Sequence, residues 1–157
     1  FSVSKSKKKV CRAISHKPAF AELRFESLVV NQFTGGNLLM LGGGLALDGA
    51  SEIHIAAPRV NWRPQPALLP VVLSPLGLGT QPSGPGWMFP TARKFALVVT
   101  QNWNTGWVIT KMNPNNPTVI TGLDPNRRIF VQVNDQRGAA HFANNRGSFD
   151  LWVKVFK

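Results

Sequence analysis

The chain has 157 residues, the length of one domain, and 43% of them are hydrophobic, which is typical of a globular protein and excludes a disordered one. Its 18 Lys and Arg residues outnumber 7 Asp and Glu residues, and the resulting net charge of +11 favours anionic partners. A single cysteine excludes an intrachain disulfide, and no apolar run approaches the roughly 20 residues that span a bilayer, so we expect no transmembrane segment.

The chain begins with a basic segment that we expect to be an arm. Residues 1–19 contain no acidic residue. The cations expected to contact an anion or a nucleic acid are Lys5, Lys7, Lys8, Lys9 and Arg12. Such a cluster attracts RNA phosphates or an acidic protein surface, although a solvated tail has the same composition. We therefore divide the chain into a basic N-terminal arm over 1–19 and one β-sandwich domain over 20–157.

Alternation of apolar and polar residues predicts several half-buried strands in this domain. In chain order, the alternating segments are Leu23–Phe25, Ile53–Ile55, Ile129–Val133 and Phe149–Val155. The other expected strands are Leu38–Leu41, Phe95–Val99 and Trp107–Thr110. Turn compositions rich in Gly, Pro and Asn separate these segments. Short strands with frequent turns indicate the all-β class, as a single β-sandwich or jelly-roll domain.

Residues 57–90 differ from the rest because they are rich in proline and show little alternation. We expect them to form a long ordered excursion across the sandwich, since each proline removes a backbone hydrogen-bond donor. One or two helical turns are expected at Pro90–Phe95.

No constellation in the sequence indicates catalysis. His16, His54 and His141 lack ligand spacing to one another or to the cysteine, which argues against a zinc site. The acidic residues are scattered, and Gly42–Gly44 is not followed by the Lys-Ser/Thr pair of a phosphate-binding loop. We therefore predict a binding protein rather than an enzyme.

Four tryptophans lie beside proline, asparagine or glycine, in contexts typical of loops and strand edges. They are Trp62, Trp87, Trp103 and Trp107. Exposed tryptophans can stack on a sugar ring or a nucleobase, because a flat apolar face suits both. The alternative, which we favour, is that they close the ends of the sandwich.

Residues 129–155 carry the most information about function. A predicted strand ends at Asn134 and Asp135, a glycine-containing loop follows, and Asn144 and Asn145 precede the last strand. The side chains of Asp135, Asn144 and Asn145 can therefore converge at one loop. A carboxylate and two amide oxygens suit calcium, and the same groups can bond sugar hydroxyls. An asparagine-rich hairpin that caps its own turns fits these residues equally well.

This strand-loop-strand segment resembles the C-terminal part of the bacterial galactose-binding calcium lectins, in which an Asn-Asp pair ends one strand and Asn-Asn, then Gly-Ser, leads into the closing strand. The resemblance implies a galactose-binding-like β-sandwich with a calcium-bridged sugar. By matching position, it implies Asp135, Asn144 and Asn145 as metal ligands, with Asp135 and Asn144 also touching the sugar. Gln136 and His141 of the same loop complete the expected sugar contacts. The chain departs from the family in its longer loop and in having no tyrosine.

Three functions fit these observations, and we expect the protein to be an oligomer or part of a larger assembly. We place first a non-catalytic, lectin-like carbohydrate-binding module assisted by calcium, because it alone rests on a motif. This function requires Arg137 and Arg146 to point away from the cation, since their charge opposes it. The second is a single jelly-roll viral capsid protein whose basic arm binds RNA. The third is an accessory structural subunit of a large complex with a degenerate ligand loop.

Overall fold

The computed structural model describes residues 19–33, 37–38, 49–64 and 71–157, and nearly all regular structure in these ranges is β. The elements are β1 (Ala21–Val29), β2 (Asn37–Leu38), β3 (Glu52–Arg63), β4 (Leu78–Pro82), β5 (Arg93–Lys94), β6 (Leu97–Thr100), β7 (Trp107–Val108), β8 (Thr118–Thr121), β9 (Phe130–Val133), α1 (Ala139–Ala143) and β10 (Arg146–Phe156). The predicted all-β class is confirmed. Among the described residues, no helix has the length and hydrophobicity to cross a bilayer.

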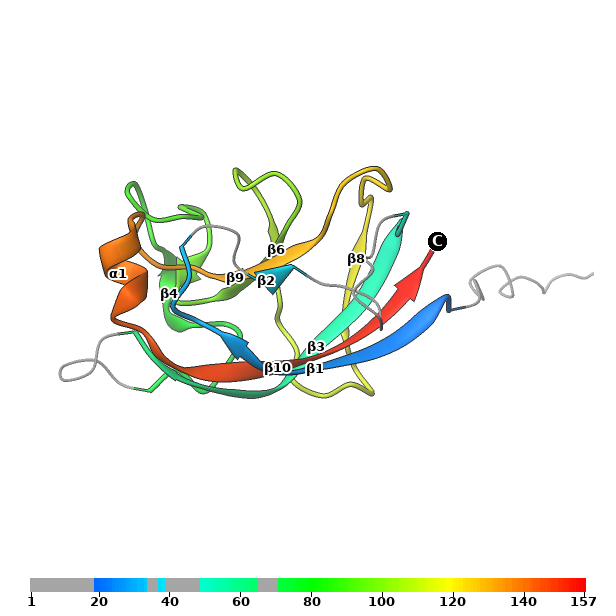
Figure 1. Cartoon of the computed structure of the whole chain (residues 1–157), viewed down its shortest axis with the longest axis horizontal. Coiled ribbons are helices and arrows are strands. Elements are labelled where there is room, and N and C mark those ends of the chain that lie inside the picture. Colours follow the sequence, from blue (N-terminus) through cyan, green and yellow to red (C-terminus); the bar gives the residue numbers. More distant parts are fainter. Residues whose placement is uncertain (1–18, 34–36, 39–48, 65–70) are drawn as a thin grey trace, which may run out of the picture.

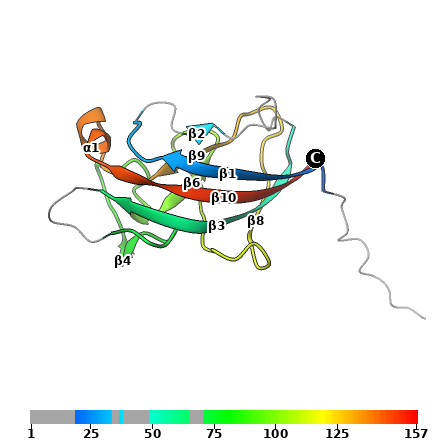
Figure 2. The same cartoon turned by 60° about the horizontal axis from the view of Figure 1, so that its bottom comes forward.

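Two antiparallel four-stranded sheets form the two layers of a sandwich (Figure 1). The first sheet has the order β1-β10-β3-β8, and the second sheet has the order β2-β9-β6-β7. β4 and β5 pair in a separate two-stranded ribbon. In Figure 2, β1, β10 and β3 lie side by side, with α1 at the end where β10 begins. The residues proposed for anion contact in the arm, Lys5, Lys7, Lys8, Lys9 and Arg12, lie outside the described residues.

The last strand shows how alternation becomes a buried face. Leu151, Val153 and Val155 of β10 each expose at most 1% of their surface, whereas Asp150 and Lys154 on the opposite face are partly exposed. Successive side chains on a strand point to opposite faces, so these three apolar residues all face the second sheet. They share one apolar cluster with residues of β6 and β9, which places the core between the two layers.

The prediction that residues 57–90 form an excursion without strands is wrong for two parts of that range. β3 continues through residues 57–63, and β4 occupies 78–82. Pro58 falls where the pairing register between β3 and β10 shifts. A strand tolerates proline at such a bulge, because the residue there has no ladder hydrogen bond to lose. The proline that argued against a strand therefore marks a bulge within one.

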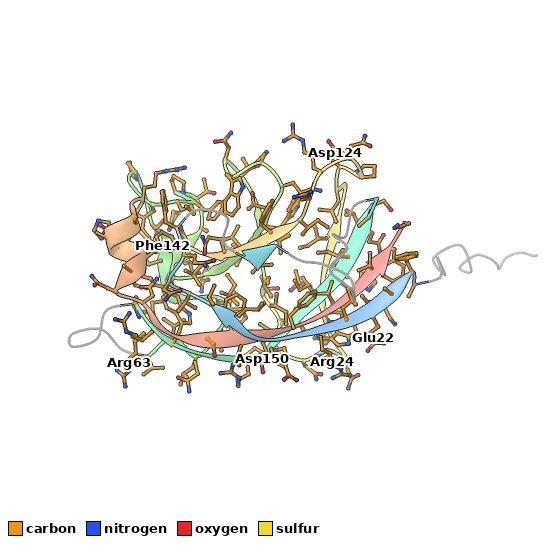
Figure 3. All side chains as sticks on the ribbon, viewed as in Figure 1. Glu22, Arg24, Arg63, Asp124, Phe142 and Asp150 are labelled. Atoms are coloured by element: carbon orange, nitrogen blue, oxygen red, sulfur yellow. The ribbon has the colours of Figure 1, made fainter. Side chains whose placement is uncertain are left out.

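The predicted helix at Pro90–Phe95 is also wrong, since that segment turns into β5. The helix α1 forms instead in the loop before β10, where no helix was expected. Phe142 of α1 is fully buried, and its ring centroid lies 5.4 Å from that of Phe33 (Figure 3). A five-residue helix is unstable by itself, so the burial of Phe142 is what holds α1 in place.

Candidate functional site

A cleft of about 270 Å³ is lined in part by α1. Figure 1 shows α1 at one end of the sandwich. The cleft is lined by residues that follow β9, by α1, and by residues of the β4–β5 ribbon. The lining residues are Pro64, Leu78, Trp87, Lys94, Phe95, Asp135, Gln136, His141 and Asn144. About half of these side chains are apolar and the others are polar, a mixture that suits a small polar ligand with an apolar face.

Asn134, directly after β9, joins the cleft to the loop that precedes β5. Its side chain is fully buried: Oδ1 accepts the N–H of Phe89 at 2.8 Å, and Nδ2 donates to the carbonyl oxygens of Phe89 at 3.0 Å and Arg93 at 2.9 Å. The N–H of Met88 donates to the carbonyl oxygen of Asp135 at 2.9 Å. These bonds fix the backbone of Asp135. The sequence marked Asn134 only as a turn residue, and this role was missed.

Asp135 is a buried carboxylate with one unsatisfied oxygen. The residue is 5% exposed, which is rare for an acidic side chain. Its Oδ1 accepts the backbone N–H of Gln136 at 2.7 Å, whereas its Oδ2 is buried and has no hydrogen-bond partner among the described residues. Burial raises the pKa of Asp135, and the Gln136 N–H, the neighbouring Asn145 amide and the charge of His141 offset only part of that rise.

The end of α1 brings two asparagines to the cleft in different ways. Asn144 follows the helix and lines the cleft with an exposed side chain. Asn145 is 1% exposed, and its Nδ2 donates to the carbonyl oxygen of Val30 at 2.7 Å. Its Oδ1 is buried and has no partner in the described part of the chain. The bond to Val30 fixes the orientation of the amide, so rotation of the side chain cannot satisfy Oδ1.

Two buried oxygens therefore have no hydrogen-bond partner among the described residues. They are Oδ2 of Asp135 and Oδ1 of Asn145, and the amide of Asn145 lies next to the carboxylate of Asp135. A buried polar atom without a partner costs about 1–3 kcal/mol, and native proteins leave few of them. Carboxylate and amide oxygens are groups that bind hard cations or ligands that donate hydrogen bonds.

The cleft brings together the residues that the sequence selected. Asp135, Gln136, His141 and Asn144, the four expected sugar contacts, all line it. Asn145, the third expected metal ligand, lies beside Asp135. The strand-loop-strand segment thus gathers its polar side chains at one place.

Four lining residues were missed because they come from the Pro-rich stretch and the segment after it. These residues are Pro64, Leu78, Lys94 and Phe95. Trp87 reaches the cleft through an isolated β-bridge with Gln136. A long segment that is ordered without regular structure often carries function, and that general signal was the one available from the sequence.

The tryptophans contribute mainly to packing. Trp62 lies within β3 rather than in a loop and is 1% exposed, so its predicted context is wrong. Trp62 and Trp87 both contact Phe95 edge-on, with ring centroids 5.7 Å and 5.2 Å apart. Trp103 is half-buried against Phe130, with ring centroids 5.0 Å apart. Trp107 is exposed, and it lines a separate polar cleft formed by residues 101–107 and 122–127.

Arg137 and Arg146, whose charge would oppose a bound cation, donate hydrogen bonds to backbone carbonyls. Nη2 of Arg137 donates to the carbonyl oxygen of Met88 at 3.2 Å. Nη1 of Arg146 donates to the carbonyl oxygens of Ala143 at 2.7 Å and Asn145 at 2.9 Å. Neither guanidinium bonds the side-chain oxygens that would face a cation.

In the ranges that the structure describes, no three His, Cys, Asp or Glu side chains lie close enough together to hold a metal ion. His54 bonds Glu52 at 2.7 Å, and His16 lies outside the described residues. A cation at the cleft would therefore be held by one carboxylate and by amide oxygens, a donor set that favours a hard ion such as calcium over zinc.

No known family model matches the chain, and no curated protein matches it in sequence. The function of the cleft is therefore argued from its own residues.

Proposed function

We propose that this domain is a non-catalytic carbohydrate-binding module whose cleft takes a galactose-like sugar with the help of a calcium ion. The observation that carries the proposal is the pair of orphaned buried oxygens, Oδ2 of Asp135 and Oδ1 of Asn145. Hard oxygen donors are the ligands that calcium prefers, and a bound cation would give both atoms the partner they lack.

The chain supplies only part of a calcium coordination sphere here. Asp135 would provide the negative charge, and Asn144 and Asn145 would add neutral oxygens from the same turn. Calcium takes about 6–8 oxygen ligands, so this set leaves positions open. When bound, the ion would offer those positions to the hydroxyl groups of a sugar.

The other lining residues match the two kinds of surface on a sugar ring. Pro64, Trp87 and Phe95 present apolar surface that suits the C–H face of a pyranose. Gln136 and His141, both exposed, carry donors and acceptors that suit its hydroxyl edge. A cleft with both kinds of surface orients a sugar as well as holding it.

Binding without catalysis follows from the acidic residues. Asp135 is the sole carboxylate among the lining residues. Glycoside hydrolysis ordinarily uses two carboxyl groups that flank the scissile bond, and this cleft offers no second one.

Isothermal titration of the protein with methyl galactoside, in calcium and in EDTA, tests the proposal. We expect heat of binding in calcium and none in EDTA. Asn144→Ala should weaken binding by about tenfold or more, because it removes a polar contact from an exposed position. Asn115→Ala, at an exposed asparagine between β7 and β8, is the matched control and should bind as the wild type does.

Two results would overturn the proposal. One is the absence of any heat with galactosides in calcium from a protein whose melting temperature shows that it is folded. The other is equal loss of binding in Asn144→Ala and Asn115→Ala, which would place the sugar elsewhere.

A further inference from the structure

Five cations lie at the cleft end of the sandwich and form what we call the basic rim. They are Arg63, Arg93, Lys94, Arg137 and Arg146. Lys94 lines the cleft itself, and each of the other four is within two residues of a lining residue. Figure 3 shows Arg63 at this end of the molecule and Asp124 at the other.

None of the rim cations forms an ion pair within the described part of the chain. The ion pairs found there join Glu22 to Arg24, Glu52 to His54, Asp124 to Arg127 and Asp150 to Arg59. The one acidic residue in the cleft is Asp135, which is buried. The acidic residues of these four ion pairs are therefore engaged with partners outside the rim.

Two of the rim cations face each other across neighbouring strands. Arg63 of β3 is directly opposite Arg146 of β10 in the pairing register. Like charges in directly opposed positions destabilise a sheet. Gly147, the second residue of β10, has φ 105°, and a Cβ there would lie 2.3 Å from the carbonyl oxygen of Asn61. The register places the two cationic residues opposite each other, and neither forms an ion pair with a described acidic side chain.

Three rim cations are already held in position. Nη1 of Arg146 bonds two backbone carbonyls, and Nη2 of Arg137 bonds one. Nζ of Lys94 lies 5.6 Å from the centre of the Trp87 ring. Groups that are already ordered lose less freedom when they bind an anion, so they recognise it more strongly.

We propose that the saccharide taken by this cleft is acidic, with a carboxylate or sulfate group that the basic rim binds. This inference rests on the proposed function and names the class of its ligand. A neutral galactoside leaves five unpaired positive charges around its site, whereas an acidic one gives them a partner. Arginine suits this task because its planar fork matches the geometry of carboxylate and sulfate oxygens.

A saccharide fits the rim better than a nucleic acid does. Proteins that bind single strands stack bases on exposed aromatic side chains along a groove. Of the five tryptophans in the chain, only Trp107 is exposed, and it lies in the other cleft. The rim instead surrounds one small cleft, which is not a groove along which successive bases could stack.

Three sugars that differ only in one group test the inference on the whole chain: galactose, galacturonate and galactose 6-sulfate. We expect titration in calcium to give about tenfold tighter binding for an acidic sugar at low salt. Raising the salt concentration should shrink that advantage, because salt screens exposed charges. Arg63→Gln should lower the ratio of acidic to neutral affinity. Arg128→Gln removes the same charge from an exposed site away from the cleft and should leave the ratio unchanged.

The outcomes separate this inference from the proposed function. Equal affinity for all three sugars in calcium would overturn the acidic ligand and leave the carbohydrate-binding function standing. Binding of none of them would overturn both. Binding of single-stranded RNA that Arg63→Gln abolishes, without competition from acidic sugars, would identify the rim as a nucleic-acid site and overturn the saccharide.

Discussion

The outer face of the first sheet and the cleft end of the sandwich contain similar polar and charged residues. They differ in whether those residues find partners within the described part of the chain. On the outer face, Asp150 accepts the N–H of Ser27 at 2.9 Å and two guanidinium N–H groups of Arg59 at 2.8 and 3.0 Å (Figure 3). Nε1 of Trp152 donates to Glu22 at 2.6 Å. At the cleft, by contrast, Oδ2 of Asp135 and Oδ1 of Asn145 have no hydrogen-bond partner among the described residues, and the rim cations form no ion pair with them.

The pKa values of Asp150 and Asp135 shift in opposite directions. The hydrogen bonds from Arg59, joined by the one from Ser27, lower the pKa of Asp150. Burial raises the pKa of Asp135, whose partners do not compensate. Charged groups that stabilise the fold find partners within the chain, and groups that lack such partners mark the place where a ligand would supply them.

We expect the largest change in stability from removing the side chain that anchors α1 at the cleft end. Phe142→Ala should lower the free energy of unfolding by about 3–5 kcal/mol, because it deletes a fully buried aromatic ring and leaves a cavity. Urea unfolding measures the change. Val119→Ala, on a valine that is 56% exposed in β8, is the control and should change stability by less than about 0.5 kcal/mol. Equal effects of the two variants would show that Phe142 does not anchor α1.

A smaller effect of opposite sign should come from the carboxylate in the cleft. Asp135→Asn should raise the stability of the calcium-free protein by about 1 kcal/mol, because it replaces a carboxylate whose charge burial disfavours with a neutral amide. It should also abolish stabilisation by calcium. Thermal melts in EDTA and in calcium measure both changes, with Asp124→Asn at the far end as the control.

The pH dependence of the same carboxylate follows from its raised pKa. The folded state holds the proton of Asp135 at pH values where the unfolded chain, with an ordinary pKa of about 3.9, has lost it. Stability of the calcium-free protein should therefore fall as the pH rises from that value through the folded pKa. Calcium affinity should rise over the same window, because the proton competes with the ion. A pH-independent difference between wild type and Asp135→Asn would contradict this.

The smallest expected effect concerns the outer face. Asp150→Asn should cost about 1 kcal/mol, since its partner Arg59 is partly exposed and water screens the pair. Because the folded pKa of Asp150 is lowered, this stabilisation is present above about pH 3.9 and is lost as the pH falls through the folded pKa. Glu26→Gln, an exposed acid on β1, is the control. An Asp150→Asn variant as stable as this control at neutral pH would refute the assignment.

Local pattern predicted the parts of the fold where one face of a strand is buried. The alternation at 149–155 predicts β10, and the Asn-Asp and Asn-Asn pairs predict which polar side chains meet at the cleft. The same reasoning failed at Pro58 and at α1. A bulge in β3 and the burial of Phe142 override the local preferences there, and both depend on distant segments.

The sequence by itself determined the all-β class, the positive charge and the set of oxygen-bearing side chains in one loop, because these follow from composition and from a period of two along the chain. Tertiary structure alone decided which of those oxygens are buried without a donor, and that Arg63 opposes Arg146 across the sheet. Burial and cross-strand register arise when segments far apart in the chain pack together, so no local pattern encodes them.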